Sequence, residues 1–175
     1  IDTLQLNKDS VVVDLGTFVG EQITDLADLG AEVHAFEPHP VFSEKLKVRF
    51  SNYDNVTINC TAAAAMNNED QKLFYKGKME DFNGGASLLM GKVDHKSKLE
   101  DKMGGEPEFF HASGCIDIAE YIEALDRPVD LLKIDVEGLE YTILGHLIAS
   151  GAINKIKTIF FADHSEDFVL IPWFN

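Results

Sequence analysis

The chain is 175 residues long, with 45% hydrophobic and 26% charged residues, which is the composition of one globular domain that can bury a core. Its 30 acidic residues outnumber 15 basic ones, and the net charge of −15 argues against nucleic acid or an anionic membrane surface as main partner. No apolar run is long enough to span a membrane, the N-terminus lacks the blocks of a signal peptide, and Cys60 and Cys115 are too few for a disulfide framework. We therefore expect a cytoplasmic protein.

Apolar, β-branched runs alternate with segments of helical periodicity, which is typical of βαβ units around a parallel sheet. The pattern predicts an α/β fold with a doubly wound, mostly parallel sheet, in a single domain over residues 1–175. In chain order, the expected elements are a strand at Val11–Leu15, a helix at Gly20–Leu29, a strand at Glu32–Phe36, a helix at Val41–Phe50, a strand at Val56–Cys60, a helix at Asp117–Leu125, a strand at Asp130–Asp135, a helix at Gly138–Ala149 and a strand at Lys157–Ala162.

The middle of the chain follows this pattern less closely. Ala62–Ala65 comes directly after a strand and is expected to form a loop or an extension of that strand, and Lys72–Tyr75 could form a short edge strand. Lys76–Glu108 is polar, rich in charge and punctuated by glycines, so we interpret it as a long surface insertion. Long loops often carry function, and we predict that this one forms a mobile lid. Regular structure is expected to resume at Phe109–Cys115.

The clearest local motif is the loop DLGTFVG, from Asp14 to Gly20, between the first expected strand and helix. Gly16 permits a tight turn and close approach of a ligand to the backbone, and Gly20 lets the helix pack near the strand. Free N–H groups at the start of a helix favour an anion. The spacing matches neither the G-x-G-x-x-G dinucleotide loop nor the P-loop, which disfavours NAD and ATP and indicates a nucleoside ligand without a pyrophosphate.

Further polar side chains follow the other expected strands. Glu37 ends the second strand, about twenty residues beyond the glycine loop, where an acid can accept hydrogen bonds from both ribose hydroxyls. Asp135 and Glu137 end a strand next to the crevice in which open α/β sheets bind ligands. Glu140 would lie one helical turn from Glu137 and is expected on a solvated face. His164 follows the last strand and should emerge at the same sheet edge.

The segments VVVDLGTFVG, AFEP, NCTAAAAMN, GGASLL and LLKIDVEGLEYTIL resemble the FkbM-type S-adenosylmethionine-dependent methyltransferases, in order from about Val11 to His164. The resemblance implies a class I, Rossmann-like fold. It implies that S-adenosyl-L-methionine is the cofactor, and that Ser87 lies near the substrate. The cofactor contacts that it implies are Asp14, Gly16, Thr17 and Gly20 in the glycine loop, Glu37 at the ribose, and Thr61, Ala62 and Ala63 at the adenine.

Two segments depart from the family pattern. The loop commonly reads D-[IV]-G-A-N-x-G in relatives, whereas this chain has Thr17 and Phe18. The last strand commonly ends in Glu-x-His, and here it ends in Ala162-Asp163-His164. Only Ser165 and the segment EDFVLIPWFN follow, so we expect the C-terminal antiparallel hairpin of the class I fold to be truncated.

A hydroxyl nucleophile loses its proton reluctantly, so O-methylation benefits from a positioned base or a metal. Asp135, Glu137 and His164 are the catalytic candidates. Oxygen ligands with one imidazole could also hold Mg²⁺ or Mn²⁺, although the sequence predicts no metal site. The resemblance implies O-methylation of a sugar or another small hydroxylated acceptor. Two alternatives stay open: a non-catalytic domain that keeps the fold, and another nucleoside-binding α/β enzyme such as a nucleotide-sugar enzyme.

Overall fold

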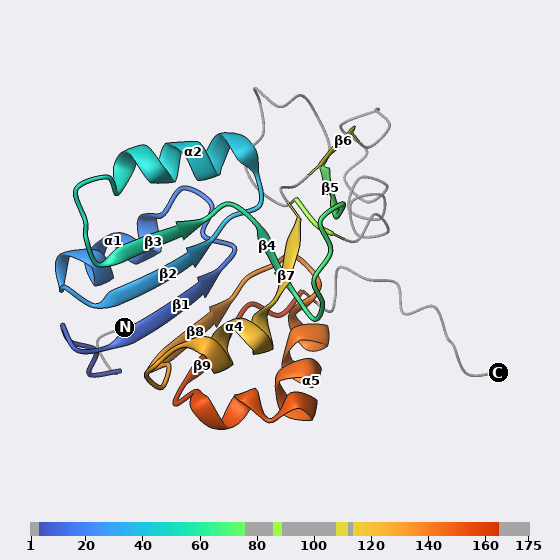
Figure 1. Ribbon diagram of the computed structural model, residues 1–175. Helices are drawn as coiled ribbons and strands as arrows, with labels where there is room; N and C mark the ends of the chain where they lie inside the picture. The colour runs from blue at the N-terminus through green and yellow to red at the C-terminus, as the bar shows by residue number, and fades with distance from the viewer. Residues whose placement is uncertain (1–3, 76–85, 89–107, 112–113, 165–175) are drawn as a thin grey trace.

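The computed structural model describes residues 4–75, 86–88, 108–111 and 114–164 (Figure 1). Its centre is a five-stranded sheet with the order β3-β2-β1-β8-β9, in which all neighbouring strands are parallel. This confirms the predicted doubly wound parallel sheet. The strands are β1 (Val11–Leu15), β2 (Glu32–Phe36), β3 (Val56–Asn59), β8 (Leu131–Ile134) and β9 (Ile159–Phe161).

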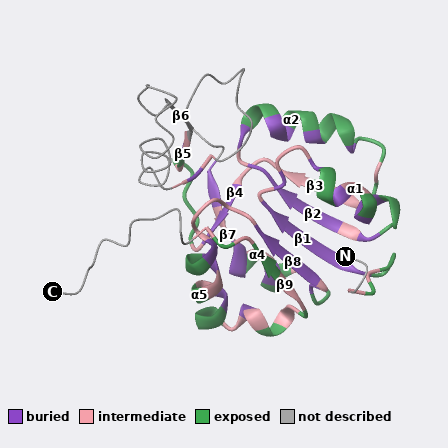
Figure 2. Ribbon diagram, turned by 180° about the vertical axis from the view of Figure 1, so that it is seen from behind, coloured by how far each residue is buried: buried purple, intermediate pink, exposed green. Residues whose placement is uncertain are grey.

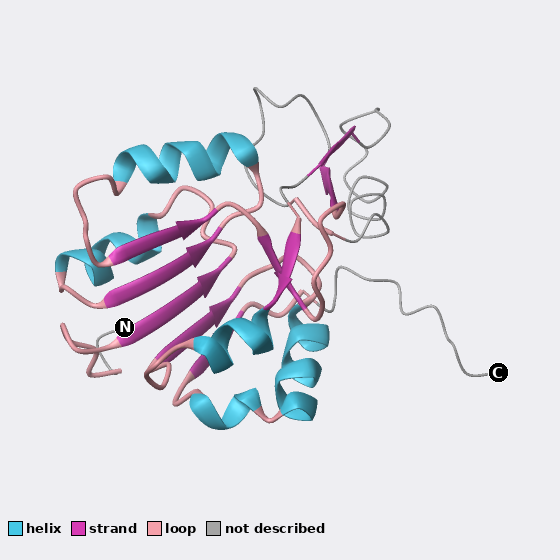
Figure 3. Ribbon diagram, in the orientation of Figure 1, coloured by secondary structure: helices cyan, strands magenta, loops and turns pink. Residues whose placement is uncertain are grey.

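Helices cover both faces of this sheet, as Figure 3 shows. Helices α1 (Glu21–Asp28) and α2 (Pro40–Arg49) lie on one face. The other face carries α4 (Ile118–Ala124), α5 (Glu140–Ser150) and the short 3-10 helix η2 (Ala152–Lys155). Within the described residues, no helix combines the length and the apolar surface that crossing a bilayer requires.

Each face of the sheet packs against its own apolar core, which is why the central strands read as continuous apolar runs. Figure 2 shows the central strands as buried along most of their length. The core under α1 and α2 includes Val12, Ile23, Leu26, Val33 and Leu46. The core under α4 and α5 includes Leu15, Phe36, Ile122, Leu132 and Ile143.

Two helix starts follow the signals in the sequence. Pro40 occupies the first turn of α2, where its missing N–H costs nothing, and the His39 side chain accepts a hydrogen bond from the Val41 N–H at 3.2 Å. Asp117 caps α4, because its carboxylate accepts from the backbone N–H groups of Ala119 and Glu120. The caps fix where each chain segment turns away from the sheet edge.

Two small sheets lie beyond the carboxyl ends of the central strands (Figure 1). Strand β4 (Ala62–Ala64) pairs in parallel with β7 (Cys115–Asp117), and β5 (Lys72–Tyr75) pairs antiparallel with β6 (Glu108–His111). Ala62–Ala64 is therefore a strand of a separate sheet. The expected regular segment at 109–115 is divided, with β6 ending at His111 and β7 beginning at Cys115.

Two predictions fall largely outside the described residues. Of the predicted lid at 76–108, only 86–88 and residue 108 are described. The predicted truncation of the C-terminal hairpin concerns residues 165–175, none of which is described. Both stay predictions.

Candidate active site at the switch point of the sheet

Strands β1 and β8 lie side by side, and the chain winds away from them in opposite directions. Open α/β sheets bind ligands at such a switch point, beyond the carboxyl ends of the strands. A cavity of about 200 Å³ lies there and brings six of the predicted site residues together. The residues that line it are Gly16, Phe18, Phe36, Glu37, Pro38, Phe42, Ala62, Ala63, Leu73, Ala86, Leu88, Asp135, Val136 and Glu137.

The two loop glycines are required by neighbouring protein atoms. Gly16 has a left-handed φ of +84°, and a Cβ there would lie 1.9 Å from the Asp135 carbonyl oxygen. A Cβ on Gly20 would lie 2.6 Å from Leu46 and 2.8 Å from Phe50, side chains on or just after α2. Gly16 therefore leaves room for the loop after β8, and Gly20 leaves room for helix α2. The sequence had suggested that Gly16 makes room for a ligand and Gly20 for a strand.

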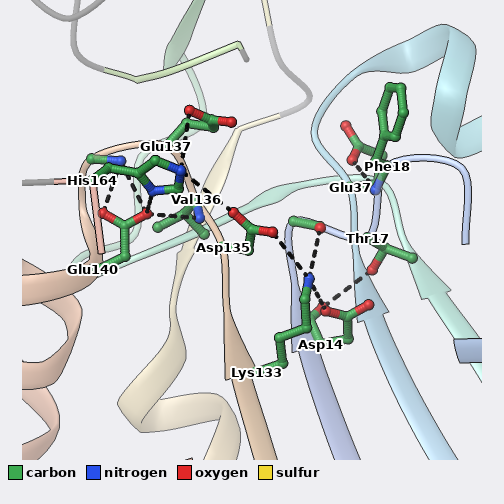
Figure 4. A network of polar contacts seen from close by, with 12 residues as sticks. Asp14, Thr17, Phe18, Glu37, Lys133, Asp135, Val136, Glu137, Glu140 and His164 are labelled. Atoms are coloured by element: carbon green, nitrogen blue, oxygen red, sulfur yellow. Dashed lines mark hydrogen bonds and ion pairs between the residues drawn. The ribbon is translucent and has the colours of Figure 1, made fainter. Parts of the chain in front are cut away.

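Asp14 is held by a lysine that the sequence analysis did not select. The Lys133 ammonium donates to Asp14 Oδ1 at 2.9 Å and to the Gly16 carbonyl at 3.3 Å, and lies 3.6 Å from Asp135 Oδ2. Burial raises the pKa of Asp14, which is only 1% exposed, and the Lys133 charge opposes that rise. A lysine within the apolar run LLKID signals such a buried partner. The pair ties β1 to β8 (Figure 4).

Asp14 and Thr17 do not line the 200 Å³ cavity. The Thr17 hydroxyl donates to the Asp14 carbonyl at 3.3 Å, and no described group hydrogen-bonds to Asp14 Oδ2. Thr61 does not line the cavity either, although its neighbours Ala62 and Ala63 do. The Thr61 hydroxyl donates instead to the Gly114 carbonyl at 2.9 Å.

Glu37 lines the cavity with a carboxylate that the backbone already orients. Its Oε2 accepts from the Phe18 N–H and its Oε1 from the His39 N–H, each at 2.8 Å. Burial raises the pKa of Glu37 to about 7, against these two hydrogen bonds, which lower it. Each carboxylate oxygen keeps a second lone pair, so the group can still accept hydrogen bonds from a diol in the cavity.

The wall next to Glu37 is apolar and aromatic. Phe18 has a left-handed φ of +54°, which is uncommon for a bulky residue, and its ring packs against Phe42 with centroids 4.6 Å apart. Leu73 and Leu88 add apolar surface, and Ala62 and Ala63 contribute only small side chains to the lining. Such a wall suits a flat aromatic group. Apart from the alanines, none of these residues stands out in the sequence as a binding residue, because each has the pattern of an ordinary core residue.

Polar side chains gather around Asp135 and Glu137 at the other end of the cavity (Figure 4). His164 and Glu140 belong to this group but do not line the cavity themselves. His164 follows β9, and its Nδ1 lies 2.8 Å from Glu140 Oε1. Its Nε2 lies 3.9 Å from Asp135 Oδ1 and 3.7 Å from Glu137 Oε2. The three predicted catalytic candidates therefore meet at one sheet edge, as parallel strands require.

The expectation that Glu140 is solvated was wrong, since it is 1% exposed. Helix α5 begins at Glu140, and both Glu137 and Gly138 have left-handed φ angles, so helical spacing does not connect Glu137 with Glu140. The Glu140 carboxylate instead accepts from the backbone N–H groups of Val136 at 3.1 Å and Gly138 at 2.9 Å. An acid in the first helical turn after a glycine was the available signal.

Ser87 holds the loop that carries Glu137. Its hydroxyl donates to the Glu137 carbonyl at 2.6 Å, and its backbone forms both bridge hydrogen bonds with Phe74. The Ser87 side chain is fully buried, while its neighbours Ala86 and Leu88 line the cavity. The predicted substrate residue thus lies beside the cavity and fixes its wall.

Within the described part of the chain, the groups that could gather around a metal ion are Asp135, Glu140 and His164, whose ligand atoms lie within 4.8 Å of one another. Both Glu140 oxygens already accept backbone N–H groups. The geometry therefore uses Glu140 as a hydrogen-bond acceptor.

The comparisons with known proteins agree with this geometry. A family model described as the methyltransferase FkbM domain matches residues 14–169, a range that contains every residue lining the cavity. No curated protein matched the sequence. A match over most of the chain, on a sheet whose topology is Rossmann-like, confirms the resemblance in the sequence, and the chain belongs to the FkbM methyltransferase family.

Proposed function

We propose that this methyltransferase uses S-adenosylmethionine to methylate a hydroxyl oxygen of a sugar or another small acceptor. Family membership supports the class of reaction. The observation that carries the finer proposal is one cavity with two chemically different ends. Glu37 and the aromatic wall stand at one end, and Asp135 and Glu137 stand at the other. His164 lies just outside this lining, with its Nε2 3.9 Å from Asp135 Oδ1 and 3.7 Å from Glu137 Oε2.

The first end suits the adenosine part of the cofactor. Glu37 would accept hydrogen bonds from the two ribose hydroxyls, and its fixed carboxylate needs no reorientation to do so. The adenine would pack against the Phe18 and Phe42 rings, and the small side chains of Ala62 and Ala63 would leave room for it. When bound, S-adenosylmethionine supplies a methyl group on a sulfonium, an electrophile that needs no further activation.

The second end suits an acceptor that must lose a proton. Methyl transfer would join the acceptor oxygen to the methyl carbon and release S-adenosylhomocysteine, and His164 Nε2 would accept the hydroxyl proton. Imidazole is the side chain that most readily exchanges a proton near neutral pH. Asp135 would orient the acceptor, because it lies between Lys133 and His164 and lines the cavity. Holding oxygen and methyl in line supplies much of the rate.

Calorimetric titration with S-adenosylhomocysteine and an acceptor panel test the proposal. We expect His164→Ala to lower turnover while leaving the affinity for S-adenosylhomocysteine intact, and Asp135→Asn to impair both turnover and acceptor binding. A chain that binds S-adenosylhomocysteine but methylates nothing would be a non-catalytic domain. A chain that binds a nucleotide sugar and not S-adenosylhomocysteine would belong to the other alternative, and either result would overturn the proposal.

A further inference from the structure

We infer that Glu140 is a positioning residue that holds the His164 imidazole as its Nδ1–H tautomer, so that Nε2 is the nitrogen that accepts the substrate proton. The inference rests on the proposed function, because it gives His164 its orientation in that reaction. It assigns a role to a carboxylate that the sequence placed on the protein surface.

Glu140 is held rigidly. Its carboxylate is 1% exposed, and the N–H groups of Val136 and Gly138 hold both of its oxygens. An ionised carboxylate only accepts hydrogen bonds. The contact of 2.8 Å between His164 Nδ1 and Glu140 Oε1 therefore requires that Nδ1 carries the hydrogen.

The other ring nitrogen of His164 points away from Glu140. His164 Nε2 faces Asp135 and Glu137, both of which line the cavity (Figure 4). Its distances to their nearest oxygens, 3.9 and 3.7 Å, are longer than a hydrogen bond. A hydroxyl group that enters this space can donate to Nε2 when that nitrogen carries no hydrogen.

The proton balance follows from this arrangement. The acceptor hydroxyl gives its proton to Nε2 as the new carbon–oxygen bond forms, and the ring becomes an imidazolium. The Glu140 carboxylate stabilises the imidazolium through the Nδ1–H hydrogen bond. With the opposite tautomer, Nε2 would already carry a hydrogen and could not accept the proton.

Helix α5, which begins with Glu140, also carries a second histidine that contacts a carboxylate and can serve as a control. His146 of α5 contacts the carboxylate of Asp117 through Nε2, at 2.8 and 2.9 Å. This pair joins α5 to the cap of α4, and neither residue lines the cavity. The same reasoning therefore assigns His146 the Nε2–H tautomer, opposite to that of His164.

Long-range ¹⁵N–¹H NMR correlates the two ring nitrogens of a histidine with its ring hydrogens and so identifies the tautomer. The measurement uses the full chain with ¹⁵N-labelled histidine, at a pH where the rings are neutral. The signals are assigned with His164→Ala and His146→Gln. We expect Nδ1–H at His164 and Nε2–H at His146 in the unsubstituted chain. Glu140→Gln should remove the Nδ1–H preference at His164 and leave the His146 pattern unchanged. An Nε2–H ring at His164 in the unsubstituted chain would overturn the inference.

Kinetics separate positioning from a purely structural role. Glu140→Gln should lower kcat about 10- to 100-fold, which is less than most of the roughly 10²- to 10⁴-fold that a general base contributes, because the base itself remains. The Kd of S-adenosylhomocysteine should change little. In the His164→Ala background Glu140→Gln should have no further effect on kcat, because Glu140 acts through His164. Equal losses in both backgrounds would mean that Glu140 only supports the loop, and would overturn the inference. His146→Gln should leave kcat unchanged.

The proposed function and this inference fail differently. A chain that binds S-adenosylhomocysteine, shows Nδ1–H at His164 and methylates no acceptor would overturn the proposed function, and with it the role of the pair in proton transfer. An active enzyme with the opposite tautomer would overturn the inference alone. An activity that requires a divalent cation bound at His164 Nε2 would also overturn it, because that nitrogen could not then accept a proton.

Discussion

Glu37 is a buried carboxylate whose pKa lies near the pH at which the enzyme is expected to work. Burial raises that pKa to about 7, and the ionised form is the one that would accept hydrogen bonds from both ribose hydroxyls at the proposed site. The affinity for S-adenosylhomocysteine should therefore rise from about pH 6 to about pH 8, by up to about tenfold per pH unit below the pKa. Calorimetric titrations across this range provide the measurement.

The matched variants for this prediction are Glu37→Gln and Glu44→Gln. Glu37→Gln should bind about 10- to 100-fold more weakly at the higher pH, the scale of one or two charged hydrogen bonds, and should lose the pH dependence. Glu44 is exposed on α2, so its substitution should change neither property. Equal affinities for Glu37→Gln and the unsubstituted chain would remove Glu37 from the ribose site.

The same group makes a prediction about stability without ligand. A glutamate ionises near 4.5 in an unfolded chain, whereas the native pKa of Glu37 is about 7. Between these values the native state binds more protons than the unfolded state, so Glu37 lowers the free energy of unfolding as pH rises. The free energy of unfolding of Glu37→Gln, relative to that of the unsubstituted chain, should rise by up to about 3 kcal/mol between about pH 4.5 and about pH 8. Urea unfolding at several pH values measures this difference. A difference between the two chains that stays constant over this range would contradict the prediction.

Gly16 offers a prediction with a control in the same chain. Gly16→Ala places a Cβ in the Asp135 carbonyl at a left-handed φ, so it should destabilise the fold by more than about 2 kcal/mol and weaken cofactor binding. Gly145 lies within α5 and a Cβ there meets nothing within 4 Å, so Gly145→Ala should stabilise by about 0.5–1 kcal/mol. Thermal unfolding measures both changes in stability. A Gly16→Ala variant as stable as the unsubstituted chain would contradict the prediction, because the loop after β8 would then move aside at little cost.

At the scale of elements, the Asp14–Lys133 pair joins β1 to β8 directly beneath the site. Lys133→Met should destabilise the fold by about 3–5 kcal/mol, because Asp14 would be left as a buried charge without its partner. Adding Asp14→Leu should recover most of that loss, since an apolar pair can replace a buried ion pair. Urea unfolding of the single and double variants decides, and additive losses would show that the two residues act independently.

The elements of the central sheet were largely predictable because each is a local pattern. The bounds of β1 and β2 match the sequence prediction, and the carboxyl ends of the strands place Asp135, Glu137 and His164 together. The strand at Ala62–Ala64 was not predictable, because its partner at Cys115–Asp117 lies far away in the sequence. These alanines carry no β-strand signal of their own.

The site was predictable where its residues end strands and not where the backbone turns. Glu140 was misplaced because the left-handed Glu137 and Gly138 break the helical spacing on which the prediction depended. Phe18 and Phe42 form a wall of the cavity, yet in the sequence they look like any buried aromatic residues. Their contribution depends on how the glycine loop approaches α2, which no local pattern encodes.

For the whole molecule, the net charge of −15 should select among acceptors of equal shape. The field of the protein raises the local concentration of neutral and cationic acceptors relative to anionic ones. The KM for an anionic acceptor should therefore fall as the ionic strength rises from about 0.01 to about 0.15 M, because salt screens the repulsion. A neutral acceptor of the same size is the control, and an anionic acceptor whose KM is insensitive to salt would contradict this prediction.

The proposed reaction is methyl transfer from S-adenosylmethionine to oxygen, with His164 as the base. It is tested most directly with cofactor labelled with ¹³C in the methyl group, offered with a panel of hydroxylated acceptors and analysed by NMR for the atom that receives the label. We predict a labelled methyl ether with the unsubstituted chain and a strongly reduced yield with His164→Ala. Label on nitrogen, an equal yield from His164→Ala, or no transfer to any acceptor would contradict the account.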